Sequence, residues 1–231
     1  MRRILHRLFR KEPQGATERV IGELSRMRRP VSFVQIGSND ADHGDPLRLY
    51  ILKYGWQGKM VEPVPYVYKR LAQKYGQLPG IELLNFAVDD APGERDFYYL
   101  SESTDQLPLW YDQLGSFLLE NVLKHRNYIP DIDQRLRTMK VRCISVVDLV
   151  TPEVDLVHSD VEGYDHKIVA SVLNSSIRPL VLIYEHIHLT PEDEKHTAAN
   201  LREAGYRLAL DGPNTICVRS DQTRLVKALG G

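Results

Sequence analysis

The stretch that decides the fold is residues 31–46, Val-Ser-Phe-Val-Gln-Ile-Gly-Ser-Asn-Asp-Ala-Asp-His-Gly-Asp-Pro. Its opening part, Val31–Ile36, is mostly apolar and predicts a buried strand that ends at Gly37. A polar turn follows, and the closing Asp-Pro pair is of the type preferred at the start of a helix, which we expect over Pro46–Tyr54. A strand, a glycine turn and a helix in this order indicate a nucleotide-binding α/β domain.

A second expected strand, Gly58–Val61, ends in an acidic residue, Glu62. A carboxylate in this position can accept hydrogen bonds from the two hydroxyls of a ribose. The dinucleotide pattern Gly-x-Gly-x-x-Gly is absent, because Ser38 and Asn39 follow Gly37. A nucleoside without phosphates, most commonly S-adenosylmethionine, therefore fits better than a dinucleotide. An ordinary glycine turn in an α/β domain is the alternative.

The rest of the chain alternates between expected strands and helices. We expect strands at Ile81–Val88, Val141–Val147, Val154–Ser159 and Pro179–Tyr184, and helices at Pro65–Tyr75, Tyr164–Leu173 and from Pro191. Two further apolar runs, Tyr206–Leu210 and Thr215–Arg219, flank a short turn and predict an antiparallel hairpin. The predicted fold class is α/β: a mostly parallel Rossmann-like sheet with helices on both faces and a C-terminal antiparallel hairpin. This order resembles class I methyltransferases more than dinucleotide dehydrogenases.

Size and composition suit one globular domain with a large core. The chain has 231 residues, of which 42% are apolar and 26% charged. No apolar run approaches the roughly 18 residues that a membrane span needs. Cys143 and Cys217 lie in apolar runs and no Cys-x-x-Cys is present, so we expect buried thiols and a cytoplasmic location.

Charge divides the chain into an expected arm and an expected domain. Residues 1–29 hold nine Lys/Arg and three Asp/Glu, and we expect a basic helical arm there. The arm could contact a membrane surface peripherally, or pack on the domain or on a second subunit of a homo-oligomer. Residues 30–231 form the expected domain, whose net negative charge argues against a nucleic-acid partner. Within it, residues 101–138 are expected to be an insertion that covers the substrate.

Several short motifs in this order resemble the FkbM family of S-adenosylmethionine-dependent methyltransferases. They lie within residues 33–40, 45–47, 54–63, 85–89, 146–149 and 160–163. The match runs from about residue 31 to 190. The resemblance implies S-adenosylmethionine as cofactor and O-methylation of a hydroxyl, commonly on a sugar or polyketide, so the expected partner is a small-molecule or glycan acceptor.

The resemblance also implies which residues bind the cofactor. The expected contacts are with the methionine part for Gly37, Ser38 and Asn39, with the ribose for Glu62, and with the adenine for Asn85, Phe86 and Ala87. The sequence departs from the family pattern at three positions, which are Gln35 in place of an acid, Ala41 in place of a glycine and His158 in place of a lysine.

The acceptor should lie at the carboxyl ends of Val154–Ser159 and Pro179–Tyr184. Two mechanisms fit the residues there. In one, Asp160, Glu162 or His186 is the general base. In the other, Asp160, Glu185 and His186 bind a divalent metal such as Mg²⁺ or Mn²⁺, with the imidazole favouring the transition metal.

Less specific interpretations stay open beside these mechanisms. Asp160 and Glu162 could cap the following helix. His158, inside a strand, is expected to be a hydrogen-bonded core residue, and Glu185-His186-x-His188 lacks the spacing of a strong zinc motif. The functional alternatives are a nucleotide-sugar or NAD-dependent enzyme on a Rossmann sheet, and a non-catalytic methyltransferase-like scaffold that binds a partner.

Overall fold

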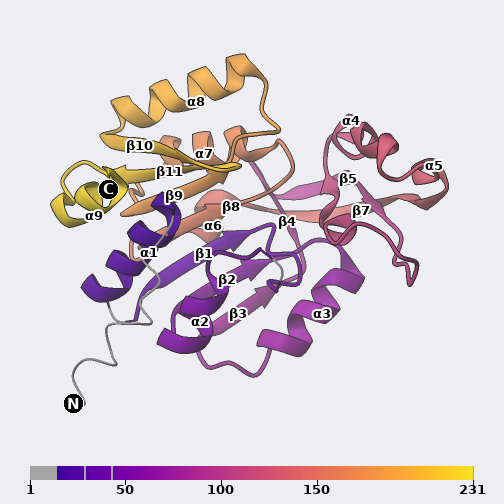
Figure 1. The fold of residues 1–231 in the computed structure, drawn as a ribbon, viewed down its shortest axis with the longest axis horizontal. Helices are drawn as coiled ribbons and strands as arrows, with labels where there is room; N and C mark the ends of the chain where they lie inside the picture. Colours follow the sequence, from indigo (N-terminus) through magenta and orange to yellow (C-terminus); the bar gives the residue numbers. More distant parts are fainter. Residues whose placement is uncertain (1–14, 29, 43, 231) are drawn as a thin grey trace, which may run out of the picture.

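The computed structural model describes residues 15–28, 30–42 and 44–230 (Figure 1). The strands are β1 Ser32–Ile36, β2 Gln57–Val61, β3 Ile81–Leu84, β4 Ala87–Asp89, β5 Gly93–Leu100, β6 Gly115–Ser116, β7 Leu136–Ser145, β8 Leu156–Ser159, β9 Val181–Glu185, β10 Tyr206–Asp211 and β11 Asn214–Arg219. The α-helices are α1 Ala16–Met27, α2 Arg48–Tyr54, α3 Pro65–Tyr75, α4 Leu119–Leu123, α5 Ile132–Arg135, α6 Val146–Leu149, α7 Asp165–Asn174, α8 Pro191–Glu203 and α9 Thr223–Gly230. None of the described helices is both long and apolar enough to span a membrane.

Within the described residues, the larger sheet has seven strands in the order β10-β11-β9-β8-β1-β2-β3. The five strands from β9 to β3 run parallel to their neighbours. The hairpin of β10 and β11 joins the edge of this group, with β11 antiparallel to β9. The predicted fold class, including its terminal antiparallel hairpin, is therefore confirmed.

Helices cover both faces of the larger sheet, as Figure 1 shows. Side chains alternate between the faces, so that on β9 Val181 and Ile183 pack with α1, α2 and α9 while Leu182 and Tyr184 pack with α7 and α8. A strand covered on both faces needs apolar residues at nearly every position. This explains why β9 has the run Val-Leu-Ile-Tyr rather than an alternating pattern.

A second sheet, in the order β4-β7-β5-β6, lies beside the first and was not predicted. The expected single strand Ile81–Val88 is wrong, because β3 ends at Leu84 and β4 pairs with β7 instead. The break follows from Asn85, whose Nδ2 donates hydrogen bonds to the carbonyls of Glu62 (2.8 Å) and Pro63 (3.1 Å). These bonds hold the chain where it leaves one sheet for the other.

The segment expected to be an insertion, residues 101–138, lies between β5 and β7 and adds β6, α4 and α5 beside the second sheet. The helix expected near residues 116–125 is shorter than predicted, since α4 covers Leu119–Leu123 and a 3₁₀ helix follows over Lys124–Asn127. The segment borders the ligand cavity described below. Its role as a substrate cover stays a prediction.

The described part of the expected N-terminal arm contains α1, which is built into the core. Its residues Val20, Ile21 and Leu24 are fully buried. The indole Nε1 of Trp56 donates a hydrogen bond to Ser25 Oγ at 2.9 Å, and Arg19 Nε donates to the carbonyl of Ala228 in α9. The rest of the expected arm, residues 1–14, lies outside the described residues.

Candidate active site

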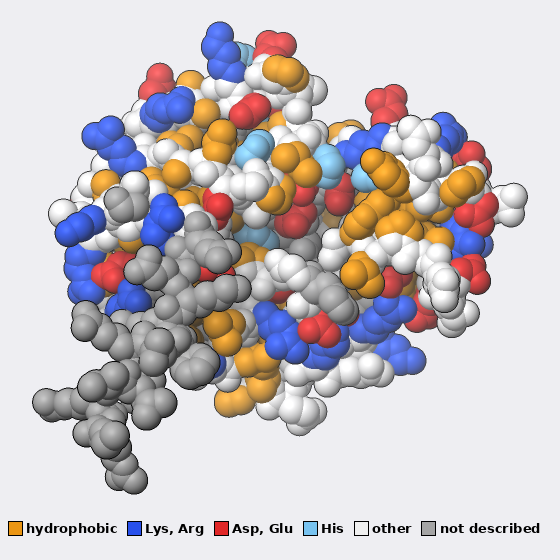
Figure 2. All heavy atoms as spheres, in the orientation of Figure 1, with side chains coloured by type: hydrophobic (Ala, Val, Ile, Leu, Met, Phe, Trp, Pro, Cys, Tyr) orange, Lys and Arg blue, Asp and Glu red, His pale blue; other side chains and the backbone are white. Residues whose placement is uncertain are grey.

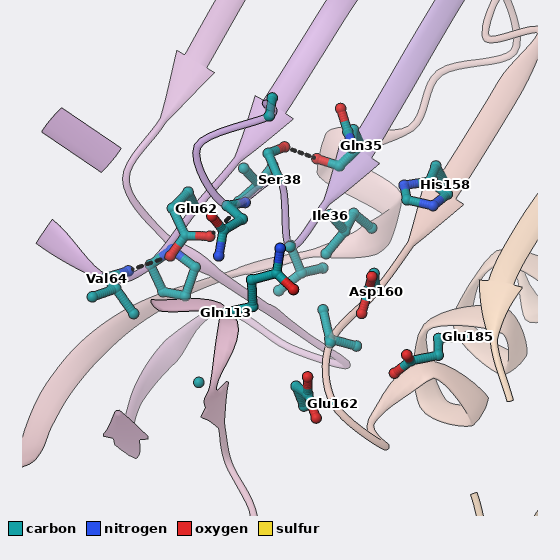
Figure 3. A pocket seen from close by; sticks show the side chains of 18 of the residues that line it. Gln35, Ile36, Ser38, Glu62, Val64, Gln113, His158, Asp160, Glu162 and Glu185 are labelled. Carbon is teal, nitrogen blue, oxygen red and sulfur yellow. Dashed lines mark hydrogen bonds between the residues drawn. The ribbon is translucent and has the colours of Figure 1, made fainter. Parts of the chain in front are cut away.

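A cavity of about 260 Å³ opens at the carboxyl ends of β1, β2, β8 and β9 (Figure 3). This volume is near the lower end of those found for ligand sites. One wall comes from the expected cover segment, through Asp112, Gln113, Gly115 and Phe117. Figure 2 shows acidic and histidine side chains gathered in the hollow between the main body and the lobe of the second sheet.

Gly37 ends β1 in a conformation that only glycine fits here. Its φ is +75°, and a Cβ atom at this position would lie 1.8 Å from the carbonyl oxygen of Asp160. The amides of Gly37 and Ser38 both donate to the carbonyl of Val61, at 3.1 and 2.9 Å. The glycine therefore lets the turn after β1 lie directly against the loop after β8, on the floor of the cavity.

Glu62 lies at the end of β2, beside this turn, and faces the cavity while being 5% exposed. Its carboxylate accepts hydrogen bonds from the amides of Asn39 (2.9 Å) and Val64 (2.8 Å). Burial raises the pKa of Glu62 to about 7. A carboxylate has about four acceptor positions, so two remain for a ligand such as a ribose.

The three residues predicted to lie near the adenine separate in the structure. Phe86 and Ala87 line the cavity. Asn85 is exposed, and its side chain holds the backbone after β2, as described above. Among the predicted cofactor contacts, Gly37, Ser38, Asn39, Glu62, Phe86 and Ala87 line the cavity, whereas Asn85 is absent from its lining. The prediction that Asn85 contacts the adenine is therefore corrected. Its side chain instead holds the backbone of Glu62.

The opposite end of the cavity is acidic. Asp160, Glu162 and Glu185 reach it from the ends of β8 and β9, as Figure 3 shows. Burial raises the pKa of all three carboxyl groups, to about 8 for Glu162 and about 10 for Glu185, and their mutual repulsion raises the pKa of the two glutamates further. Two carboxylate oxygens, Oε2 of Glu162 and of Glu185, are buried and accept no hydrogen bond within the described part of the chain.

The loop after β8 is held by the second-sheet lobe. Glu162 has a φ of +52°, which is unusual for a residue with a side chain. Its carbonyl accepts hydrogen bonds from Ser116 Oγ (3.2 Å) and Asn121 Nδ2 (2.5 Å). Neither Asp160 nor Glu162 caps α7, because its N-cap residue is Tyr164 and no side chain caps it. Asp165 instead accepts a hydrogen bond from the amide of Val161 in this loop.

The histidine that contacts the acidic side chains is His188 rather than His186, although His188 is not among the residues that line the cavity. His186 Nδ1 lies 3.1 Å from Thr215 Oγ1, and His186 does not line the cavity. His188 Nε2 lies 3.2 Å from Glu162 Oε2 and 3.6 Å from Glu185 Oε2. A turn after β9, in which the Leu189 amide donates to the His186 carbonyl, brings His188 back towards the carboxylates.

This geometry corrects the predicted metal ligands. Among the described residues, the group with metal-ligand spacing is Glu162, Glu185 and His188, not Asp160, Glu185 and His186. His186 is likewise not placed to act as a base on a ligand in the cavity. The sequence does contain this histidine, in the motif Glu185-His186-x-His188, but the spacing of that motif is only weak evidence for a metal site.

Two further polar side chains of the cavity have unpartnered atoms, and both are departures from the family pattern. Gln35 donates from Nε2 to Asp45 at 2.9 Å, while its Oε1 has no hydrogen-bond partner among the residues that the structure describes. His158 is buried, and its Nδ1 has no partner within the described residues. The expected hydrogen bond of a core histidine is not found at this nitrogen. Buried polar atoms without partners are rare unless a ligand or water meets them, so these fit a polar ligand.

Lys124 was missed by the sequence analysis. It follows α4, and its Nζ lies 2.7 Å from His188 Nδ1. Burial lowers the pKa of Lys124. Burial and the neighbouring charge of Lys124 together lower the pKa of His188 to about 4. No sequence spacing links residues 124 and 188, so only the fold reveals this pair.

The sheet order, the terminal hairpin and the acid at the end of β2 together define a class I S-adenosylmethionine-dependent methyltransferase fold. The family model for the methyltransferase FkbM domain matches residues 35–208, about three quarters of the chain. The chain therefore belongs to the FkbM methyltransferase family. A search of curated proteins gave no significant match.

Solved structures with the same kind of fold include a methyltransferase FkbM from Methylobacillus flagellatus KT, at 10% identity and a TM-score of 0.50. The similarity covers 82% of this chain and 44% of that one, so the chain spans less than half the length of that protein. Two others are a precorrin-6y C5,15-methyltransferase from Geobacter metallireducens GS-15 (12% identity, TM-score 0.42, covering 87% and 85%) and an Aeropyrum pernix fibrillarin with natively bound S-adenosyl-L-methionine (12%, 0.42, covering 82% and 66%).

Proposed function

We propose that this protein is an S-adenosylmethionine-dependent O-methyltransferase that acts on a hydroxyl of a sugar, a glycan or a glycosylated small molecule. The observation that carries the proposal is Glu62, a buried carboxylate with free acceptor positions that faces a cavity at the ends of parallel strands. A ribose diol is the ligand group that such a carboxylate binds. The family supports methyl transfer, and the hydroxyl acceptor rests on the family resemblance together with the acidic end of the cavity.

In this proposal the cofactor supplies an electrophilic methyl group, and the chain's residues bind and orient it. Glu62 accepts hydrogen bonds from the ribose hydroxyls. Phe86 and Ala87 offer apolar surface to the adenine, and the turn of Gly37, Ser38 and Asn39 lies beside the methionine part. The unpartnered atoms of Gln35 and His158 suit the polar groups of an amino acid.

The acceptor hydroxyl must lose its proton as its oxygen attacks the methyl carbon. Asp160 is the acid best placed to take it, since its carbonyl lies against Gly37 and its side chain lines the cavity. Burial raises its pKa, which makes it a stronger base than an exposed aspartate. Glu162 lines the same end, but its side chain meets His188. The predicted role of His186 as a base is not carried into this proposal.

Calorimetric titration with S-adenosylmethionine and S-adenosylhomocysteine tests the proposal. We expect one saturable site for each ligand, with affinity lowered about tenfold or more in Glu62→Gln. Absence of heat from a folded protein would contradict the proposal. A shift in NADH fluorescence on mixing would favour the nucleotide-dependent alternative instead. Cofactor binding without methyl transfer to any glycan or glycoside in a labelled-methyl screen would favour a non-catalytic scaffold.

Several finer expectations remain predictions. These are a cytoplasmic location, a peripheral membrane or subunit contact through residues 1–29, a homo-oligomer and no nucleic-acid partner. Cys143 and Cys217 are buried free thiols, which suits a reducing compartment. A divalent metal is not proposed with the ligand set first expected, because the structure does not bring those three side chains together.

A further inference from the structure

The acidic end of the cavity contains three ligand atoms at distances that suit one metal ion. One ligand atom from each of Glu162, Glu185 and His188 lies within 4.8 Å of the other two. His188 Nε2 is 3.2 Å from Glu162 Oε2 and 3.6 Å from Glu185 Oε2. Ligands held about 2.1 Å from a tetrahedral or octahedral metal lie about 3.0–3.4 Å apart. The three side chains therefore need only small movements to share an ion.

A second observation separates this group from an ordinary surface cluster of acids. Glu185 is 8% exposed, and its Oε2 is buried without a hydrogen-bond partner among the described residues. Glu162 Oε2 is likewise buried without a hydrogen-bond partner among those residues. Leaving a buried carboxylate oxygen without a partner is costly unless a cation or proton meets it. Both unpartnered oxygens belong to the group with metal-ligand spacing, and both residues line the cavity.

The charge at this end of the cavity is also unbalanced. The carboxyl groups of Asp160, Glu162 and Glu185 all line this end of the cavity. The neighbouring lysine is Lys124, which contacts His188. When the carboxyl groups are ionised, as metal binding requires, one ammonium group cannot balance three carboxylates, so the ionised cluster favours a further positive charge.

We propose that Glu162, Glu185 and His188 bind a divalent transition-metal ion such as Mn²⁺ or Zn²⁺ at the acceptor end of the cavity. Two carboxylates and one imidazole suit these ions better than Mg²⁺ or Ca²⁺, which prefer oxygen ligands alone. Three protein ligands leave coordination positions open. An ion there can hold the acceptor oxygen and make its proton easier to remove, with Asp160 as the base.

The surroundings hold His188 in a fixed orientation. Its second ring nitrogen, Nδ1, lies 2.7 Å from Lys124 Nζ, and its ring meets that of His125 edge-on, with 6.3 Å between the centroids. Glu162 is held in turn by the bonds of Ser116 and Asn121 to its carbonyl. Two of the three ligands are thus positioned by the second-sheet lobe.

The test is titration of the metal-stripped full-length protein with Mn²⁺ and with Zn²⁺, followed by calorimetry and, for Mn²⁺, by electron paramagnetic resonance. We expect binding of one ion per chain, weakened about tenfold or more in His188→Gln and in Glu185→Gln. His186→Gln is the matched control, since His186 lies outside the ligand group, and it should bind as the wild type does. Circular dichroism and melting curves of each variant establish that it is folded.

The metal proposal can fail while the function proposed above stands. Only the role assigned to the ion in methyl transfer rests on that proposed function. S-adenosylhomocysteine binding by the same metal-stripped protein reports on the cofactor site alone. If that ligand binds and neither ion does, the metal site is wrong and the methyltransferase proposal stands. Loss of ion binding in His186→Gln, with His188→Gln unaffected, would also overturn the ligand set. Ion binding at the wild-type level by both Glu185→Gln and His188→Gln would also contradict this ligand set.

Discussion

At the end of β2, the side chain of Glu62 combines a structural and a proposed binding role. Its two hydrogen bonds to backbone amides hold the turn after β1 against the start of α3, while the same carboxylate faces the cavity. Because burial raises its pKa to about 7, Glu62 is partly protonated near neutral pH. Its charge therefore changes in the range where binding is readily measured.

This charge leads to a prediction for cofactor binding. If the ionised carboxylate binds the ribose, affinity for S-adenosylhomocysteine should rise about tenfold between pH 6 and pH 8, because a group with a pKa near 7 is mostly protonated at the lower pH. Calorimetry across this range measures the effect. Glu62→Gln should show weaker binding with no such trend. An equally steep trend in that variant would assign the titration to another group.

Gly37 is predicted to tolerate no side chain. Gly37→Ala would place a Cβ atom 1.8 Å from the Asp160 carbonyl, so we expect a loss of about 3 kcal/mol or more in the free energy of unfolding. Gly55 is the matched control, with a φ of +65° but open space around its Cβ position. Gly55→Ala should lose only about 1–2 kcal/mol. Urea unfolding of both variants gives the comparison, and equal losses would contradict the close contact.

At the scale of elements, α4 and β6 connect the second-sheet lobe to the loop that carries the acidic residues. Asn121 in α4 donates to the carbonyl of Glu162, a residue in a left-handed conformation. Neighbouring Gly163 lies close to the same side chain, since a Cβ there would meet Asn121 Nδ2 at 2.4 Å. The lobe thus positions one wall of the acceptor end.

We predict that Asn121→Ala impairs the acceptor end of the cavity and leaves cofactor binding at the other end nearly unchanged. Loss of the hydrogen bond should lower the free energy of unfolding by about 1 kcal/mol and methyl transfer by about tenfold, since Glu162 loses its support. Affinity for S-adenosylhomocysteine should change less than about twofold. Exposed Glu120, in the same helix, provides the control variant Glu120→Ala. A parallel loss of cofactor affinity in Asn121→Ala would show that the lobe does not act on the acceptor end alone.

The helix α1 belongs to the core of the larger sheet, although the sequence suggested a separate arm. Leu24 is fully buried among residues of the sheet and of α9. Leu24→Ala should therefore lower the free energy of unfolding by about 2–5 kcal/mol. Cofactor affinity at a temperature where the variant is folded should be unchanged. A loss below about 1 kcal/mol in chemical unfolding would show that α1 contributes little to the core.

At the scale of the whole molecule, the larger sheet could be predicted because its central strands are buried on both faces and are therefore short and mostly apolar. The hairpin was recognisable from two such runs around Asp211-Gly212-Pro213-Asn214. The second sheet could not be predicted in the same way. β5 is only partly buried and β4 has three residues. Part of β5, Asp96–Leu100, could be expected as a short antiparallel strand, but nothing in these patterns indicated a separate sheet.

The candidate site likewise contains residues that the sequence predicts and residues that only the fold reveals. Residues that directly follow a strand, such as Gly37, Glu62, Asp160 and Glu185, were placed correctly at the cavity, because parallel strands end at one edge of a sheet. Lys124 was not identified, and His188 was noted only within the motif Glu185-His186-x-His188, because a turn and a helix of the lobe bring these side chains together beside the carboxylates. Contacts between segments that lie far apart in sequence depend on the complete fold.

The most direct measurement of the central claim is a crystal structure with S-adenosylhomocysteine bound. The adenosine should lie in the cavity between the Gly37 turn and Phe86, with both ribose hydroxyls within hydrogen-bonding distance of the Glu62 carboxylate. Density for the ligand elsewhere, or in this cavity with its ribose away from Glu62, would contradict the account.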